Sequence, residues 1–204
     1  MTLRTDDPVD QLYRATATPR LVTVPALGFL CLDGHGGPGN PDYARAVQAL
    51  FAVSYAVRFA VKKAGGPAYT VSPLECLWWA EDLSTFHDGD KTQWEWRLLL
   101  RQPADVTKEL CLPLAEETAA SKGMPAAREL RFVSFEEGAA AQVLHVGPYA
   151  DEGPTIERLH AFIHERGFAF DGHRHKHHEI YVGDPRRAAP ERLRTIIRQP
   201  YAVP

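Results

Sequence analysis

The segment Leu100-Arg101-Gln102-Pro103 recurs as Ile197-Arg198-Gln199-Pro200, 97 residues further along the chain. Before each copy comes a long helical pattern and then a strand pattern with an inner glutamate, PLECLWW at 73–79 and HHEIYV at 177–182. Because the same order of elements precedes both copies, duplication explains the recurrence better than chance does. The chain is therefore predicted to contain two βαββ halves related by a pseudo-two-fold axis.

The first half is predicted to span residues 20–122, after an N-terminal arm at 1–19 that is polar and lacks periodicity. Its elements follow from β-branched and aromatic runs, from a helical stripe that repeats every four residues, and from Gly and Pro at the ends. They are a strand at 20–33 broken near Pro25, a helix at 42–63, strands at 73–80 and 94–101, and a helix at 105–122 that Pro113 is expected to kink or split.

The second half is predicted to span residues 128–200 and to repeat this order. Its elements are strands at 129–135 and 141–146, a helix at 152–166, and strands at 177–182 and 193–199. Two βαββ halves define an α+β fold, with an antiparallel sheet and helices on one face. The other face is then free to form a concave ligand groove.

Strand alternation assigns the side chains of HHEIYV to two faces. His177, Glu179 and Tyr181 share one face, and Ile180 and Val182 share the other. The Ile180 face has the apolar character of core packed against a helix. Glu179 and Tyr181 are therefore expected on the uncovered side of the sheet.

All four tryptophans, Trp78, Trp79, Trp94 and Trp96, fall in one predicted hairpin. An aromatic-walled cleft with a carboxylate suits a flat apolar ligand, above all a cationic one, because ring faces attract both. The alternative for the tryptophans is ordinary hairpin core. For Glu75 and Glu179 the alternative is a salt bridge to Arg101 or Arg198.

Composition narrows the class of protein. The 204 residues are 45% hydrophobic and carry a net charge of −3, which fits a folded domain and gives no basic surface for direct nucleic-acid binding. Three cysteines lie far apart without a CxxC pair, as in proteins of a reducing compartment. Neither a signal peptide nor an apolar run near 20 residues is evident, so a cytoplasmic location away from membranes is expected.

The run HRHKHH at 173–178 places alternate histidines on one strand face, where they could hold Zn²⁺ or Ni²⁺. No Cys stands at ligand spacing, and Glu179 is the one carboxylate that could complete a site, so a polar loop is favoured and no metal or other cofactor is expected. The glycine-rich HGGPG at 35–39 lacks the Walker lysine and is not expected to cradle phosphate.

The sequence resembles the GyrI-like small-molecule-binding domains in their stand-alone form, from about Pro19 to Pro200. The resemblance rests on FLCLDGHGGPGNPDYARAVQALFAVSYAVRF, PLECLWW, WEWRLLLRQP, LHVGPYADEGPTIERLHAFI and HHEIYVGDPRR…LRTIIRQP. Two positions depart from the family pattern. Gly37 stands where an acidic residue is usual, and Cys76 stands where a glycine is usual.

This resemblance implies that residues 20–204 form one GyrI-like domain around a groove that binds hydrophobic, often aromatic or cationic, xenobiotics. In regulators of this kind the domain is joined to a helix-turn-helix module, and nothing before Pro19 reads as one. Some stand-alone relatives are similar to hydrolases of cyclopropane-bearing DNA-alkylating antibiotics. The residues carried over are Glu179, Tyr181, Trp78 and Trp79.

Three functions follow. A binding protein would stack planar compounds on Trp78 or Trp79, Trp96 and Tyr181, with Glu179 receiving positive charge. A hydrolase would use Glu179 as the base, with Tyr181, Tyr149 or His145 donating to the developing oxyanion. A module that binds a protein partner is the third. The predicted catalytic residues are Glu179 and Tyr181, and the predicted ligand-binding residues are Trp78, Trp79, Trp96, Glu75, His145, Tyr149, Glu179 and Tyr181.

Overall fold

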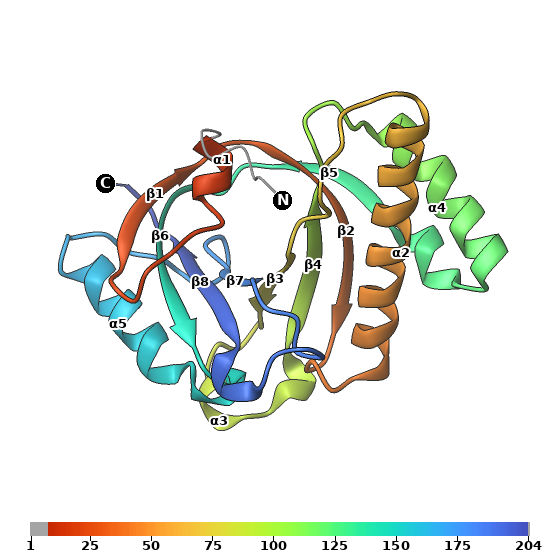
Figure 1. Cartoon of the computed structure of the whole chain (residues 1–204). Helices are drawn as coiled ribbons and strands as arrows, with labels where there is room; N and C mark the ends of the chain where they lie inside the picture. The colour runs from red at the N-terminus through yellow and green to blue at the C-terminus, as the bar shows by residue number, and fades with distance from the viewer. Residues whose placement is uncertain (1–7, 204) are drawn as a thin grey trace. The chain divides into compact units, whose positions relative to one another are not determined.

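A computed structural model describes residues 8–203 of the chain. These residues form two compact units. The central unit is Ala26–Phe135, and the split unit combines the described residues up to Pro25 with those from Glu136 onward. Figure 1 shows the helices and strands of both.

The central unit contains an antiparallel sheet in the order β3-β4-β2-β5. Its elements are β2 (Leu27–His35), α2 (Pro41–Lys63), β3 (Leu74–Trp79), α3 (Thr85–Asp88), η1 (Lys91–Gln93), β4 (Glu95–Arg101), α4 (Lys108–Lys122), η2 (Pro125–Glu129) and β5 (Arg131–Phe135).

The split unit contains a second antiparallel sheet in the order β1-β6-β8-β7. Its elements are α1 (Pro8–Gln11), β1 (Arg20–Val24), β6 (Gly138–Val146), η3 (Tyr149–Asp151), α5 (Gly153–His164), β7 (His177–Tyr181), η4 (Pro190–Arg192) and β8 (Arg194–Pro200).

The α+β class and the recurring βαββ order are confirmed. In β2-α2-β3-β4 and in β6-α5-β7-β8 alike, the last strand lies between the other two. The predicted strand at 20–33 breaks at Pro25, as expected, into β1 and β2. The symmetry axis and the concave groove concern the arrangement of both halves and stay predictions.

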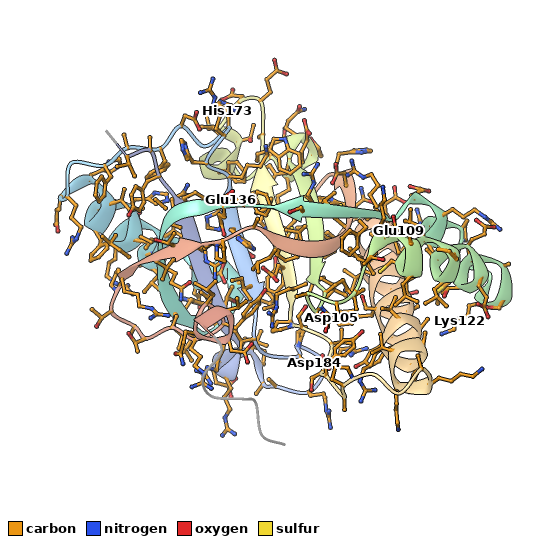
Figure 2. The ribbon with its side chains drawn as sticks, turned by 90° about the horizontal axis from the view of Figure 1, so that it is seen from above. Asp105, Glu109, Lys122, Glu136, His173 and Asp184 are labelled. Atoms are coloured by element: carbon orange, nitrogen blue, oxygen red, sulfur yellow. The ribbon has the colours of Figure 1, made fainter. Side chains whose placement is uncertain are left out.

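Helix α2 begins where the sequence predicts. Asn40 caps it by accepting a hydrogen bond from the Asp42 backbone N–H, and Pro41 occupies the first turn, where a missing N–H costs nothing. Helix α4 differs from its prediction, because it starts at Lys108 and continues through Pro113 as one helix. Figure 1 shows α2 and α4 side by side, and Figure 2 labels Glu109 and Lys122 near the two ends of α4.

One side of the central sheet packs on α2. Gln102 at the end of β4 donates to the Ser54 hydroxyl of α2 over 3.3 Å, and the Tyr43 ring of α2 lies 5.3 Å from the ring of Trp96. Trp96 also covers Gly34, where an added Cβ would come within 2.2 Å of the indole. On the other side Phe29, Cys31, Leu77 and Leu99 form a second apolar cluster.

Among the described residues, helix α2 alone has the length and apolarity of a membrane span. Its 23 residues include a stretch with a mean hydropathy of 1.2, enough for a span by length and composition. Its buried residues, among them Leu50 and Val53, form part of the protein core. A core helix passes the same test of length and composition.

In the split unit α5 covers one face of the sheet. Leu159 and Ile163 of α5 pack with Val143 of β6 and Ile197 of β8. The opposite face meets the chain before β1: Leu12 is 7% exposed, and its carbonyl accepts a hydrogen bond from Arg198 over 2.8 Å. The described part of the predicted arm, residues 8–19, is thus bonded to this unit.

The predicted facing of β7 is wrong. Glu179 pairs with Ile197, whose side chain packs under α5, and Ile180 pairs with Ile196 on the other face. Paired residues of an antiparallel ladder share a face, so Glu179 lies on the α5 side. Glu75 pairs with Leu99, on the face away from α2. Glu179 thus lies on the helix-covered face of its sheet, and Glu75 lies on the face away from the helix. The two sites differ because the pairing of β7 with β8 is shifted by one residue relative to that of β3 with β4.

Candidate active site

Glu179 lies at the centre of a group of polar side chains in the split unit. The Tyr181 hydroxyl donates to Glu179 Oε2 over 2.7 Å, and His177 Nε2 lies 3.2 Å from Oε1. The three residues alternate along β7, so their side chains share one face. The Glu179 side chain is 14% exposed. Its carboxylate is thus held in one orientation, on a side chain that is partly exposed.

Glu152 adds a second carboxyl group beside Glu179. It precedes α5, is 4% exposed, and its Oε1 has no hydrogen-bond partner. Burial and then the charge of Glu179 raise the pKa of Glu152 to about 9. The two carboxyl groups therefore hold one proton between them near neutral pH.

Two tyrosines border this pair of carboxyl groups. The Tyr149 ring packs edge-on against the Tyr181 ring at 5.6 Å and is 40% exposed. Burial, Glu152, Glu179 and Asp184 raise the pKa of the Tyr149 hydroxyl. Tyr149 stays neutral at physiological pH and offers an aromatic surface to a ligand at this edge.

The turn before α5 places Tyr149 and Glu152. Gly147 has a φ of +140°, a conformation that other residues rarely adopt. His145 then fixes the turn, since its Nε2 lies 3.1 Å from the Pro148 carbonyl and its Nδ1 lies 3.2 Å from the Thr155 hydroxyl. Both ring nitrogens of His145 are engaged, so its role in this structure is to position the turn.

The other predicted site residues lie in the central unit. Trp78 and Trp96 are 4% and 1% exposed and pack with Tyr43 of α2, Trp78 in a stacked arrangement. Trp79 is partly buried on the other face, against the cluster of Leu77 and Leu99. Glu75 is 1% exposed on that same face. The structure thus brings together Glu179, Tyr181, Tyr149 and His145 within one unit.

Glu152 is the residue that the sequence analysis missed. A glutamate before Gly-Pro at the start of a helix is typical of exposed helix N-termini, where negative charge is favourable. Burial of this carboxyl depends on Thr195 and Glu179, which lie far away in the sequence and come together with it only in the folded sheet.

Of the four histidines at 173–178, His177 lies beside Glu179, and the other three belong to structural contacts. Asp171 Oδ1 accepts backbone N–H bonds from His173, Arg174 and His175, which forms a polar turn. His178 pairs with Glu137 at 2.9 Å on the other face of β7. Within residues 8–203 no group of three metal-binding side chains comes together.

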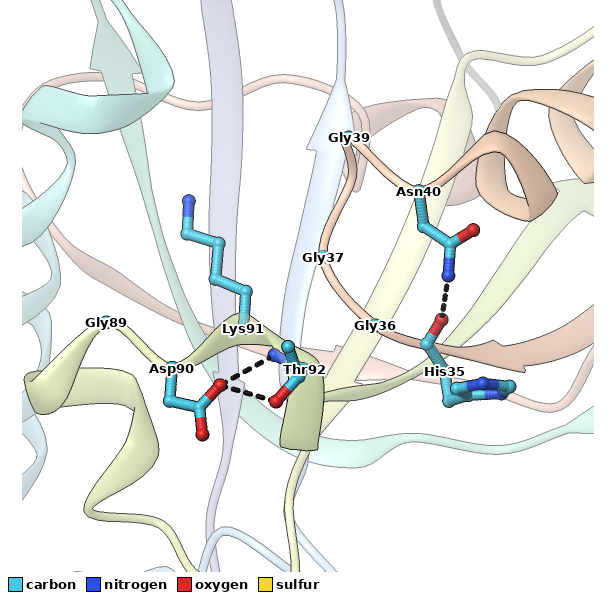
Figure 3. A pocket seen from close by; sticks show the side chains of 9 residues that line it. All are labelled: His35, Gly36, Gly37, Gly39, Asn40, Gly89, Asp90, Lys91 and Thr92. Atoms are coloured by element: carbon cyan, nitrogen blue, oxygen red, sulfur yellow. Dashed lines mark hydrogen bonds between the residues drawn. The ribbon is translucent and has the colours of Figure 1, made fainter.

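A surface pocket of about 710 Å³ opens in the central unit, around the glycine-rich loop before α2 (Figure 3). Its lining includes Gly36, Gly37 and Lys91, and Asn40 bonds back to the His35 carbonyl over 3.2 Å. None of the predicted site residues lines it. Glu152 and Glu179 of the split unit therefore remain the candidate groups for acid–base chemistry.

Two βαββ units, one of which carries a partly exposed carboxylate between tyrosines, form an arrangement suited to binding a small molecule. The chain belongs to the GyrI-like family: the model of the GyrI-like small molecule binding domain matches residues 17–202. The resemblance found in the sequence is thereby confirmed. No curated protein matches the sequence.

Three solved structures illustrate the likeness. An uncharacterized conserved protein from Listeria innocua is 35% identical with a TM-score of 0.86, over 95% of this chain and 96% of that one. A hydrolase encoded by lin2189 from Listeria innocua is also 35% identical, with a TM-score of 0.83 and the same coverage. The EcmrR C-terminal domain is 12% identical with a TM-score of 0.53, over 91% and 97%, and shares the fold alone.

Proposed function

We propose that the protein is a hydrolase of hydrophobic, planar small molecules in which Glu179 activates water. The single observation that carries the proposal is the Glu179 carboxylate, oriented by Tyr181 and His177 on a side chain that is 14% exposed. Such a carboxylate can position a water and take its proton. The likeness to a protein described as a hydrolase, over nearly the whole of both chains, supports the same class.

The substrate class we propose is a compound with a strained, electrophilic ring, the cyclopropane-bearing alkylators that the family resemblance implies. Water attacks a ring carbon as Glu179 removes its proton, and a carbon–carbon bond of the ring breaks. The electron pair of that bond moves onto a conjugated carbonyl, and protonation of the resulting enolate completes the addition of water. Tyr149 and Tyr181, whose rings pack edge-on, flank the proposed reaction site.

The second candidate is binding without turnover. The partly exposed ring of Tyr149 beside a carboxylate is the pairing that attracts a flat cation. In that case Glu179 supplies negative charge and no bond of the ligand breaks. The protein would then protect by sequestering its ligand.

Glu179→Gln separates these functions. The amide keeps the size of the side chain and removes the base, so turnover of a cyclopropane-bearing alkylator should fall about 10²–10⁴-fold while binding persists. The ring-opened product is followed by chromatography and binding by calorimetry. Glu165→Gln, an exposed residue just after α5, is the matched control. Full turnover in Glu179→Gln would refute the hydrolytic role, and binding of a planar cation without any product from the wild type would favour sequestration.

A further inference from the structure

We infer that Glu152 donates a hydrogen bond, and then a proton, to a carbonyl oxygen of the substrate, so that the site selects compounds whose electrophilic carbon is conjugated to a carbonyl. This inference rests on the proposed function and deepens it. It assigns the second partner that water addition needs, a group that stabilises the oxygen where negative charge develops.

Tyr181 and His145, two of the proton donors predicted from the sequence, already make other hydrogen bonds. A tyrosine hydroxyl has one proton to donate, and that of Tyr181 goes to Glu179. His145 uses one ring nitrogen toward the Thr155 hydroxyl and the other toward the Pro148 carbonyl. Of the described acidic groups whose pKa Glu179 raises, Glu152 and Tyr149 are the two candidate proton donors.

The position of Glu152 favours it over Tyr149. Its side chain is almost fully buried, its Oε1 lacks a hydrogen-bond partner, and its carboxyl lies close enough to Glu179 to feel that charge strongly. A buried oxygen without a partner is costly unless something binds it. Tyr149, at 40% exposed, has no such demand.

Glu152 has the protonation state that a donor needs. Burial and Glu179 raise its pKa to about 9, so its carboxyl is neutral where Glu179 acts as a base. The N-terminus of α5 favours the charged form of a carboxyl group, but this effect lowers a pKa by only roughly one unit. Burial beside a second carboxylate outweighs that effect.

The two carboxyl groups divide the reaction between them. Glu179 takes one proton from the attacking water, whose oxygen bonds to the ring carbon as the carbon–carbon bond breaks. Glu152 stabilises the enolate that forms and protonates it. Each turnover leaves Glu179 protonated and Glu152 charged, and transfer of one proton between these neighbours restores the starting state. The sum is addition of one water across one bond.

The test compares Glu152→Gln and Glu152→Leu with wild type and with Glu157→Gln, an exposed control on α5. Wild-type turnover should decline above about pH 9, where a carboxyl of raised pKa loses its proton. Glu152→Gln keeps a hydrogen-bond donor that does not titrate, so this alkaline limb should disappear. Glu152→Leu removes the donor and should lose about 10²–10³-fold in kcat.

Tyr149→Phe provides the competing arm. If the phenol is the donor, this variant rather than Glu152→Leu loses turnover and the alkaline limb, and the inference is overturned. Glu152→Leu with wild-type turnover overturns it equally. Thermal melting of each variant reports whether it is folded.

A binding measurement separates this inference from the proposed hydrolysis. Calorimetry compares a planar carbonyl compound with its carbonyl-free analogue on wild type and Glu152→Leu. We expect at least tenfold preference for the carbonyl compound in the wild type and none in Glu152→Leu. That result supports the donor even if the wild type forms no product, an outcome that refutes only the hydrolase. Equal affinities in the wild type refute the donor even if Glu179 proves to be catalytic.

Discussion

Glu152 holds a proton at neutral pH that the unfolded chain would not hold. Its pKa in the folded protein is about 9, above the ordinary value near 4.5. A raised pKa makes its contribution to stability greatest below pH 4.5, and that contribution is lost as pH rises toward 9. The site therefore carries a stability cost that grows with pH, as residues tuned for function commonly do.

Glu152→Gln should remove this cost. The amide has no proton to take up, so the melting temperature of the variant should exceed that of wild type by a margin that grows between pH 5 and pH 9, by about 2–4 °C for each kcal/mol. Differential scanning calorimetry across that range measures the margin. A margin that is constant with pH would contradict the raised pKa of Glu152.

At the residue scale, the sequence predicted that His177, Glu179 and Tyr181 share one face of their strand, but it did not predict Glu152 beside them. Tyr181 follows two positions later on a strand, and that spacing suffices to place both side chains on one face. Glu152 has no such local signal. Its raised pKa depends on contacts with β7 and β8, which no pattern within one segment encodes.

At the element scale, strand and helix order could be predicted and strand register could not. Every predicted strand and helix has a counterpart, and most limits agree within a few residues. The predicted orientation of β7 was wrong because both faces of this strand are packed, so the apolar side chain of Ile180 does not identify the face that α5 covers. A single-residue difference in register exchanges all side chains between faces, and the apolar pattern of a five-residue strand is too short to decide it.

The pair formed by Gly34 and Trp96 shows how closely β2 and β4 are matched. An alanine Cβ at position 34 would come within 2.2 Å of the buried indole, which cannot move without disturbing Tyr43. Gly34→Ala should therefore destabilise the protein by roughly 1–3 kcal/mol. Urea denaturation measures this loss. Gly39→Ala is the control, since no atom lies within 4 Å of an added Cβ there, and equal midpoints for the two variants would contradict the argument.

At the scale of the whole molecule, one buried ion cluster joins segments from both ends of the sequence. Glu137 accepts from Arg198 at 2.9 Å and pairs with His178 at 2.9 Å, and Arg198 also donates to the Leu12 carbonyl. Burial alone would raise the pKa of Glu137, but His178 and Arg198 reverse this and hold it at about 2. Arg198, in the second copy of the recurring Arg-Gln-Pro segment, thus bonds the predicted N-terminal arm to the rest of the split unit.

Glu137→Gln should leave the charges of this cluster without balance and destabilise the protein by about 3–5 kcal/mol. Because the lowered pKa of Glu137 stabilises the folded state above pH 4.5 and this is lost as pH falls through about 2, the variant should also lose part of the wild-type acid sensitivity. Acid and urea titrations followed by circular dichroism test both. Glu136→Gln, at the exposed neighbouring residue labelled in Figure 2, should leave stability unchanged.

The division into a central and a split unit sets an order of events during translation. The central unit is one continuous segment, Ala26–Phe135, and can complete its sheet as soon as β5 has left the ribosome. Strand β1 has no such opportunity, because Arg20 pairs with Gln142. At ribosomal speeds of about 5–20 residues per second, the intervening stretch of about 120 residues takes roughly 6–24 s to synthesise. For that interval β1 stays an unpaired β-branched strand, and the central unit is finished only near its end, once Phe135 has been synthesised. A chaperone has most reason to hold the nascent chain while β1 is unpaired.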